Sequence, residues 1–145
     1  EGDEPVVGDR VICLRNNYMS KMCVLFNGML GTITELEKAG KGRKWHWYRA
    51  VIAMDGEDRP YTGRICRHQF NNPSVVRMVE GVRPERVGDS FDLGYAMTVH
   101  KAQGSQAGRV ILFEEHAPMW RGGMWNRWLY TAVTRAEREL YIIGG

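Results

Sequence analysis

The sequence predicts an α/β protein in two parts, a β-rich first part and a second part built on a parallel sheet. In residues 1–90, short alternating runs rich in β-branched residues are separated by the turn pairs Asn27-Gly28 and Asp55-Gly56. In residues 91–145, two continuous apolar runs flank a helix-like run, an order typical of a parallel sheet. The composition, 43% hydrophobic and 26% charged, is that of a globular protein of 145 residues.

The strands expected in the first part are short and lie at 6–14, 29–36, 45–54 and 59–67. In the second strand, alternation places Leu30, Thr32, Thr34 and Leu36 on one side and Ile33 on the other. Short strands linked by tight turns suggest a small barrel of SH3-like size. Residues 70–84 have no clean period and are expected to form an irregular excursion from this barrel.

The second part alternates strand and helix. Residues 93–100 fit a strand and a helix equally well, and a short buried strand is expected at 109–113. Residues 125–136 predict a helix, because its apolar residues recur at helical spacing at Trp128, Leu129, Ala132 and Val133. A last buried strand is expected at 140–143.

The net charge and the cysteine content limit the classes of function that the protein can have. A net charge of +3 permits nucleic-acid binding without demanding it. Three cysteines without a CxxC pair indicate reduced thiols and a cytoplasmic setting. A zinc site from Cys66, His68 and a distant cysteine lacks paired ligands, so we expect no metal site. No apolar run is long enough for a membrane span, and a start at Glu1 rather than Met leads us to expect a piece of a longer protein.

The segment YAMTVHKAQGSQ at 95–106 gathers polar groups beside a glycine. Hydroxyl, imidazole, ammonium and amide groups at a chain turn are donors suited to phosphate oxygens. Gly104 allows the backbone to approach a ligand closely. The alternative is a polar surface loop with many donors.

The segment LYTAVTRAEREL at 129–140 places Thr131, Thr134 and Arg135 on one side of the predicted helix or at its end. Arg135 can point into a cleft, or it can stabilise the helix by facing the negative end of the helix dipole. We expect it to face solvent, where an arginine contributes little to folding stability.

A basic-aromatic stretch follows the second predicted strand. Lys41, Arg43 and Lys44 precede Trp45 and Trp47. Basic side chains track phosphates and aromatic faces stack on bases, so this loop is a candidate contact for single-stranded DNA. The alternative is a β-hairpin in which Trp45 and Trp47 fill one face, with Trp47 in the core, while the lysines stay solvated.

The segments TVHKAQGS at 98–105 and YTAVTRA at 130–136 together resemble motifs V and VI of superfamily I DNA helicases of the RecD/Dda-like branch. GDRVICLRNNY at 8–18 and NGMLGTI at 27–33 resemble the start of the SH3-like insertion in the second motor domain of this branch. The resemblance implies a RecA-like half domain with a parallel sheet at 91–145 and an inserted SH3-like β-barrel at 1–90.

The resemblance also implies residue roles. Arg135 matches the motif VI arginine that reaches the ATP γ-phosphate across the cleft between two motor domains. Gln103 and Gly104 would face the nucleotide, and Gln106 stands where relatives often carry a glutamate near the ribose. Thr98 and His100 would contact the DNA backbone.

The chain lacks a GxxxxGKS/T loop and an acidic magnesium-binding motif after an apolar strand. We therefore expect a C-terminal module of an ATP-dependent helicase, with 5′→3′ polarity implied by the resemblance. ATP and Mg²⁺ are the expected cofactors, with Mg²⁺ held by an N-terminal motor domain of the same protein. The isolated chain is expected to be inactive as an ATPase. The alternative function is a non-catalytic nucleic-acid-binding or protein-docking module with a helicase-like fold.

Overall fold

The computed structural model describes residues 4–19, 23–39, 46–72, 74–83, 86–114 and 122–144. The chain divides into two compact units, Glu1–Ala96 (unit 1) and Met97–Gly145 (unit 2), and each is described by itself. This division falls slightly after the one at residue 90 that the sequence predicts, because the strand at 91–93 pairs within unit 1.

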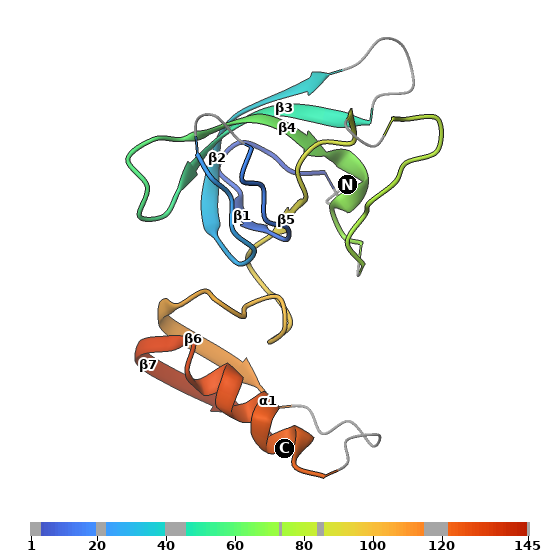
Figure 1. Ribbon diagram of the computed structural model, residues 1–145. Coiled ribbons are helices and arrows are strands. Elements are labelled where there is room, and N and C mark those ends of the chain that lie inside the picture. Colours follow the sequence, from blue (N-terminus) through green and yellow to red (C-terminus); the bar gives the residue numbers. More distant parts are fainter. Residues whose placement is uncertain are drawn as a thin grey trace. The chain divides into compact units, whose positions relative to one another are not determined.

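Unit 1 is a five-stranded antiparallel sheet (Figure 1). Its strands are β1 (Arg10–Cys13), β2 (Leu30–Ala39), β3 (Trp47–Met54), β4 (Tyr61–Cys66) and β5 (Phe91–Leu93), in the spatial order β4-β3-β2-β1-β5. The four predicted strands are present with different bounds, and β5 is a strand that the sequence did not predict. Only its last residue, Leu93, belongs to the ambiguous segment 93–100, whose other residues form neither strand nor helix. Strands β1 to β4 are neighbours in chain order, each antiparallel to the next, and the turn at Asp55-Gly56 follows β3 before β4.

The sheet does not close into a barrel, so the predicted SH3-like barrel is not confirmed. β4 and β5 are its edge strands. A single parallel bridge between Ile65 and Asp89 joins β4 to the segment just before β5. There the Cys66 N–H donates to the Asp89 carbonyl at 2.8 Å, and the Asp89 N–H donates to the Arg64 carbonyl at 2.7 Å.

A β-bulge in β2 changes which side chains face the core. The register against β3 shifts between Ile33 and Glu35. Ile33 is buried, Thr34 is exposed, and Leu36 packs against the core that Ile33 joins. The predicted side shared by Leu30, Thr32, Thr34 and Leu36 is therefore wrong, because the extra residue of a bulge reverses the alternation.

The core of unit 1 lies on one face of β3. Tyr48, Ala50, Ile52 and Met54 are buried there. Trp47 points to the opposite face, where it is half-buried and the Arg64 guanidinium lies 5.6 Å from its ring centroid. The alternative in which Trp47 fills the core is wrong, since side chains of a strand alternate between its two faces.

The irregular excursion after β4 starts at a short 3-10 helix, η1 (Arg67–Gln69). The Gln69 side chain is fully buried and holds the following chain. Its Nε2 donates to the carbonyl of Ser74 at 3.2 Å, and its Oε1 accepts from the N–H of Val76 at 2.8 Å. A buried polar side chain needs such hydrogen-bond partners. In this irregular segment, the bonds from Gln69 hold the backbone in place of strand pairing.

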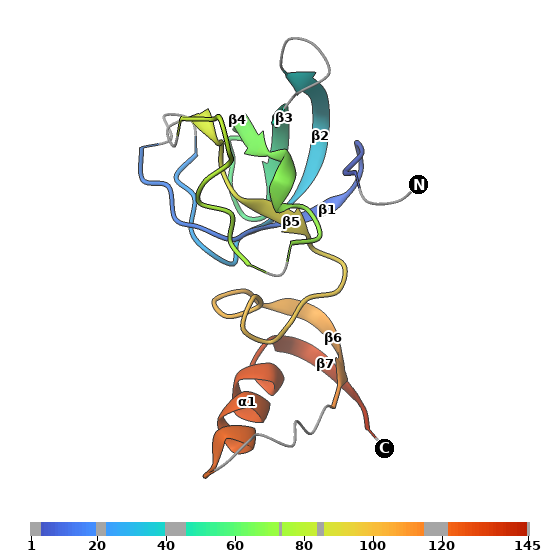
Figure 2. The ribbon, with the colours of Figure 1, turned by 90° about the vertical axis from the view of Figure 1, so that its right-hand side faces the viewer.

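Unit 2 contains two parallel strands, β6 (Ala107–Phe113) and β7 (Ala136–Ile143), and the helix α1 (Met124–Val133). The helix lies along the strand pair (Figure 2). Leu112 and Ala132 are buried, whereas Ile111 and Phe113 are 61% and 65% exposed. The parallel sheet predicted from the sequence is therefore present as a pair of strands with one covered face. No helix in the described part of the chain combines the length and apolar character of a membrane span.

The helix ends earlier than predicted, and the last strand begins earlier. The Thr134 hydroxyl donates to the backbone of α1, with its Oγ1 2.9 Å from the Tyr130 carbonyl oxygen. The Ala107 N–H already donates to the Arg135 carbonyl at 2.9 Å, where the two strands begin to run side by side. Pairing with β6 thus extends β7 over residues 136–139, of which Glu137, Arg138 and Glu139 are charged and gave no apolar strand signal.

Candidate nucleotide and nucleic-acid site

The segment of residues 98–105, the turn segment, is built from consecutive hydrogen-bonded turns. The Ala102 N–H donates to the Thr98 carbonyl at 3.0 Å, and the Ser105 N–H donates to the Ala102 carbonyl at 3.0 Å. Gly104 has a φ of +93°, which side chains rarely adopt. The turns leave the predicted DNA contacts Thr98 and His100 exposed, together with Gln103, Gly104 and Gln106.

Arg135 joins the end of α1 to the turn segment. Its Nε donates to the Thr131 carbonyl, its Nη1 to the Ser105 carbonyl and its Nη2 to the Thr134 hydroxyl, each at 3.0 Å. The side chain is half-buried, so the expectation of a solvent-facing arginine without structural contacts is wrong. A guanidinium has five N–H donors, and these three bonds leave two of them for another acceptor.

Gln106 is the second predicted nucleotide residue that lies beside the end of α1. Its Nε2 lies 3.5 Å from the Thr134 carbonyl oxygen, to which it donates. The structure thus places Gln106 and Arg135 on neighbouring backbone segments. Gln103 and Gly104 lie in the turn segment, and no hydrogen bond joins them to Arg135 among the described residues.

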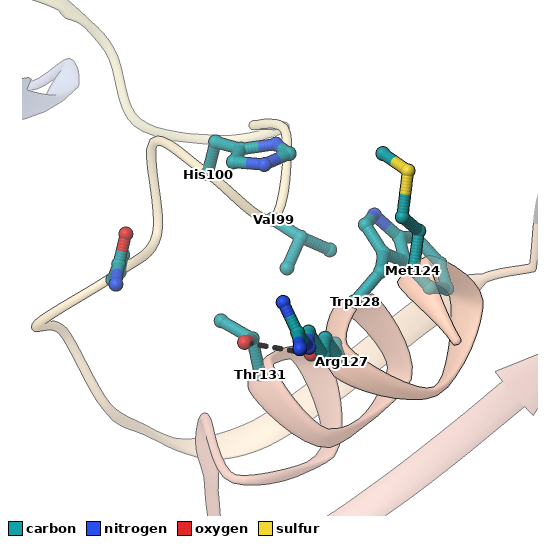
Figure 3. A pocket seen from close by; sticks show the side chains of 7 residues that line it. Val99, His100, Met124, Arg127, Trp128 and Thr131 are labelled. Carbon is teal, nitrogen blue, oxygen red and sulfur yellow. Dashed lines mark hydrogen bonds between the residues drawn. The ribbon is translucent and has the colours of Figure 1, made fainter. Parts of the chain in front are cut away.

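A cavity of about 310 Å³, the turn–helix pocket, lies between the turn segment and α1 (Figure 3). The turn segment contributes Val99, His100 and Gln103. The helix contributes Met124, Arg127, Trp128 and Thr131, the last of which donates its hydroxyl to the Arg127 carbonyl at 2.8 Å. These four helical residues follow the spacing i, i+3, i+4 and i+7, a signal in the sequence that would have revealed a shared face.

The predicted DNA-binding loop lies outside the described residues, since Lys41, Arg43, Lys44 and Trp45 all belong to the segment between 39 and 46. The flanking residues are described. Lys38 forms an ion pair with Glu4 at 3.0 Å, and the Glu4 pKa lies below its ordinary value because Lys38 and then Arg67 hydrogen-bond to it. The described lysine that precedes this segment in the sequence, Lys38, is therefore already paired.

His46 directly follows this segment in the sequence, and its ring lies against that of His68 in η1. His46 Nδ1 and His68 Nε2 are 3.0 Å apart. Burial lowers the pKa of His68, and His46 and Arg67 lower it further. Cys66, which stands two residues before His68, is fully buried, and burial raises the pKa of its thiol. Among the described residues, no three His, Cys, Asp or Glu side chains are grouped as a metal site would require.

Comparison with known proteins places unit 2 in a helicase context. Residues 93–143 match the UvrD-like helicase C-terminal domain family. The chain is 44% identical over 115 residues to the ATP-dependent RecD2 DNA helicase of Deinococcus radiodurans, covering 65% of this chain and 16% of that protein. It is 32% identical over 120 residues to the RecBCD enzyme subunit RecD of Mycobacterium tuberculosis, covering 74% of this chain and 20% of that protein.

The fold is also similar to that of a solved helicase. A structure of two coordinating Pif1 helicases at forked double-stranded DNA matches with a TM-score of 0.53 at 24% identity, covering 94% of this chain and 27% of that one. At this identity the likeness concerns the fold. The chain spans between 10% and 20% of the length of the curated proteins that it matches.

Proposed function

Because the chain belongs to the RecD/Dda-like branch of the superfamily I helicases and corresponds to their C-terminal part, we propose that it is the C-terminal module of an ATP-dependent DNA helicase. In this proposal the module couples ATP hydrolysis to 5′→3′ movement along single-stranded DNA. An N-terminal motor domain of the same protein supplies the phosphate loop and holds Mg²⁺. Residues 1–90 are the insertion, and residues 91–145 are the portion of the motor domain that carries motifs V and VI.

The bridge from Arg135 to Ser105 is the observation that carries this proposal. Through a contact of 3.0 Å, the arginine assigned to ATP is fixed to the segment that holds Thr98 and His100, the residues assigned to DNA. Any shift of the guanidinium toward a γ-phosphate must therefore move or break a contact with the turn segment. Such a shared element is what coupling between a nucleotide site and a DNA site requires.

The chemistry suits the two donors that Arg135 retains. Phosphoryl transfer depends on positioning and on stabilising the charge that develops on the phosphate oxygens. The three intramolecular bonds orient the guanidinium in advance, so little side-chain entropy is lost when a phosphate binds. Gln103, Gly104 and Gln106 complete the nucleotide side in this proposal, and the segment containing Lys41, Arg43, Lys44 and Trp45 adds DNA contacts.

The test is Arg135→Lys and Arg135→Ala in a chain that joins this module to an N-terminal motor domain. DNA-stimulated ATP turnover should fall by about 10³–10⁵-fold in the alanine variant, and the lysine variant should also be severely impaired because it lacks the planar fork. The measurement is phosphate release in the presence of single-stranded DNA, with unwinding of substrates of each polarity in parallel.

A matched control separates the phosphate role from the structural one. Thr134→Val keeps the shape of the side chain and removes the hydroxyl that accepts from Arg135 Nη2. Its turnover should stay within a few-fold of the parent. Equal losses in Thr134→Val and Arg135→Ala, or an unfolded unit 2 in the lysine variant, would show that Arg135 acts only by holding the fold.

A further inference from the structure

The turn–helix pocket is lined in part by residues to which the proposed function gives no role. Its apolar surface comes from Val99, Met124 and the half-buried ring of Trp128, and its polar edge comes from His100, Gln103 and Arg127. Among the described residues, no acidic side chain lines it. A concave apolar surface with a few converging polar groups is the usual form of a small-ligand site, and about 300 Å³ is the lower end of the usual volumes.

Arg127 gives the pocket its charge. Its side chain is exposed, and it forms no ion pair with any residue in the described part of the chain. It lies one helical turn from Thr131 and next to Trp128, so its guanidinium and the indole belong to the same edge of α1 (Figure 3). His100 stands on the opposite side, on the turn segment. An anionic group between Arg127 and His100 would be attracted to Arg127 at neutral pH.

We propose that the turn–helix pocket binds one base of a single-stranded nucleic acid, with the base against Trp128 and the adjoining phosphate at Arg127. This inference rests on the proposed function, which places single-stranded DNA at His100. Base stacking on an aromatic face tolerates any base, and an arginine alongside neutralises the backbone charge. The Gln103 amide carries both donors and an acceptor, so it can meet the edge of the base.

The experiment measures the binding of the 145-residue chain to two labelled oligonucleotides of equal length by fluorescence anisotropy. One is oligothymidylate, and the other is an abasic strand of deoxyribose and phosphate alone. One stacked base is worth about a 5- to 150-fold preference for the strand with bases. We expect the unaltered chain to show at least this preference.

Trp128→Ala should abolish the contribution of this base and reduce the preference by about 5-fold or more. Because Trp128 is half-buried, Met124→Glu provides a second variant: Met124 is 52% exposed, and a carboxylate at the pocket edge should exclude the base and its phosphate without disturbing the fold. Arg127→Ala should weaken binding to both strands. Its matched control is Arg109→Ala on β6, which removes the same charge from an exposed position outside the pocket and should leave the preference unchanged.

The outcomes separate the two proposals. The base pocket is overturned if Met124→Glu and Trp128→Ala still bind both strands and keep the same preference for the strand with bases. That result leaves the proposed function in place. An equal loss on both strands in Met124→Glu, with the preference intact, also overturns the base pocket, because the pocket then acts through charge alone. No binding of the unaltered chain to either strand overturns the DNA contact and the pocket together.

Discussion

The two units of the chain bury their apolar side chains to very different extents. In unit 1, Val11, Ile12, Leu25, Ile52 and Phe91 are completely buried. In the described part of unit 2, the buried side chains are Leu112 and Ala132 alone. The difference lies in the strand pairing. An antiparallel sheet assembled from neighbouring strands encloses its own core, whereas a parallel pair needs a cover on both faces.

The uncovered face of unit 2 follows from its register. Ile111 pairs with Tyr141 and Phe113 with Ile143, and all four side chains are more than half exposed. Leu112, which points the opposite way, is buried. Within unit 2 the helix thus covers one face of the strands, and we expect unit 1 to hold most of its stability in its own core while unit 2 does not. Two experiments test this contrast, and a third tests how the edge of unit 1 is held together.

The largest effect is expected from alkaline pH, and it should fall on unit 1. Burial raises the pKa of Cys13 from 9.0 to about 11 and that of Tyr48 from 10.0 to about 12. Burial also raises the pKa of Tyr61, whose hydroxyl donates to Asp89 at 2.6 Å. The folded state holds these protons more tightly than the unfolded state does. Stability is therefore complete below pH 9 and is lost as the pH rises toward 12.

Unit 2 is the internal control, because its tyrosines Tyr130 and Tyr141 are 71% and 54% exposed rather than buried. Isoleucine methyl resonances report the two units separately, with Ile33, Ile52 and Ile65 in unit 1 and Ile111 and Ile143 in unit 2. The native isoleucine signals of unit 1 should disappear between pH 10 and 12, before the signals of unit 2 change. Native unit 1 signals at pH 12 would contradict the prediction.

Truncation of matched core residues should give the next largest effect. Ile52→Ala removes a fully buried side chain from β3 and should cost about 2–5 kcal/mol of unfolding free energy in unit 1. Leu112→Ala in unit 2 should cost less, because its neighbours on β6 are exposed and the site already borders solvent. Thiol labelling in urea measures unit 1 alone, since Cys13, Cys23 and Cys66 all lie there and are buried.

Ile52→Ala should lower the urea midpoint for labelling, and Leu112→Ala should leave it unchanged. An equal shift in both variants would mean that the units unfold as one, and the contrast between a self-contained and an incomplete core would then fail.

The smallest effect is expected from Gly88, where the absence of a side chain allows the backbone to lie close to the edge strand β4. Gly88 has a φ of +87°, and a Cβ there would lie 2.8 Å from the Arg64 carbonyl oxygen, next to the bridge between Ile65 and Asp89. Gly56 has a similar φ of +77° with nothing within 4 Å. Gly56→Ala should cost about 1–2 kcal/mol for the left-handed conformation alone, and Gly88→Ala should cost more. Equal thermal shifts in the two variants would show that β4 and the segment before β5 are not held together.

The elements of this chain could be predicted because their signals are local. Turn pairs such as Asn27-Gly28 and Asp55-Gly56 set the order of the hairpins, and helical spacing located α1 to within a few residues. Motifs V and VI were recognisable as short strings of residues. Each of these signals depends on neighbours within a few positions, which the sequence displays directly.

What the sequence could not determine depends on residues far apart in the chain. The bulge in β2 arises from pairing with β3, and it decides that Leu36 joins the core beside Ile33. The alternation of β3 sends Trp47 outward to Arg64. Arg135 is hydrogen-bonded rather than free because its guanidinium donates to the carbonyl of Ser105, which lies thirty positions away in the sequence. The turn–helix pocket likewise exists only where the turn segment meets one edge of α1. Local patterns in the sequence were enough to locate four of the strands, the helix and the two motifs. Which side chains meet, and that residues 91–93 form a strand, depends on pairing partners elsewhere in the chain that local patterns do not specify.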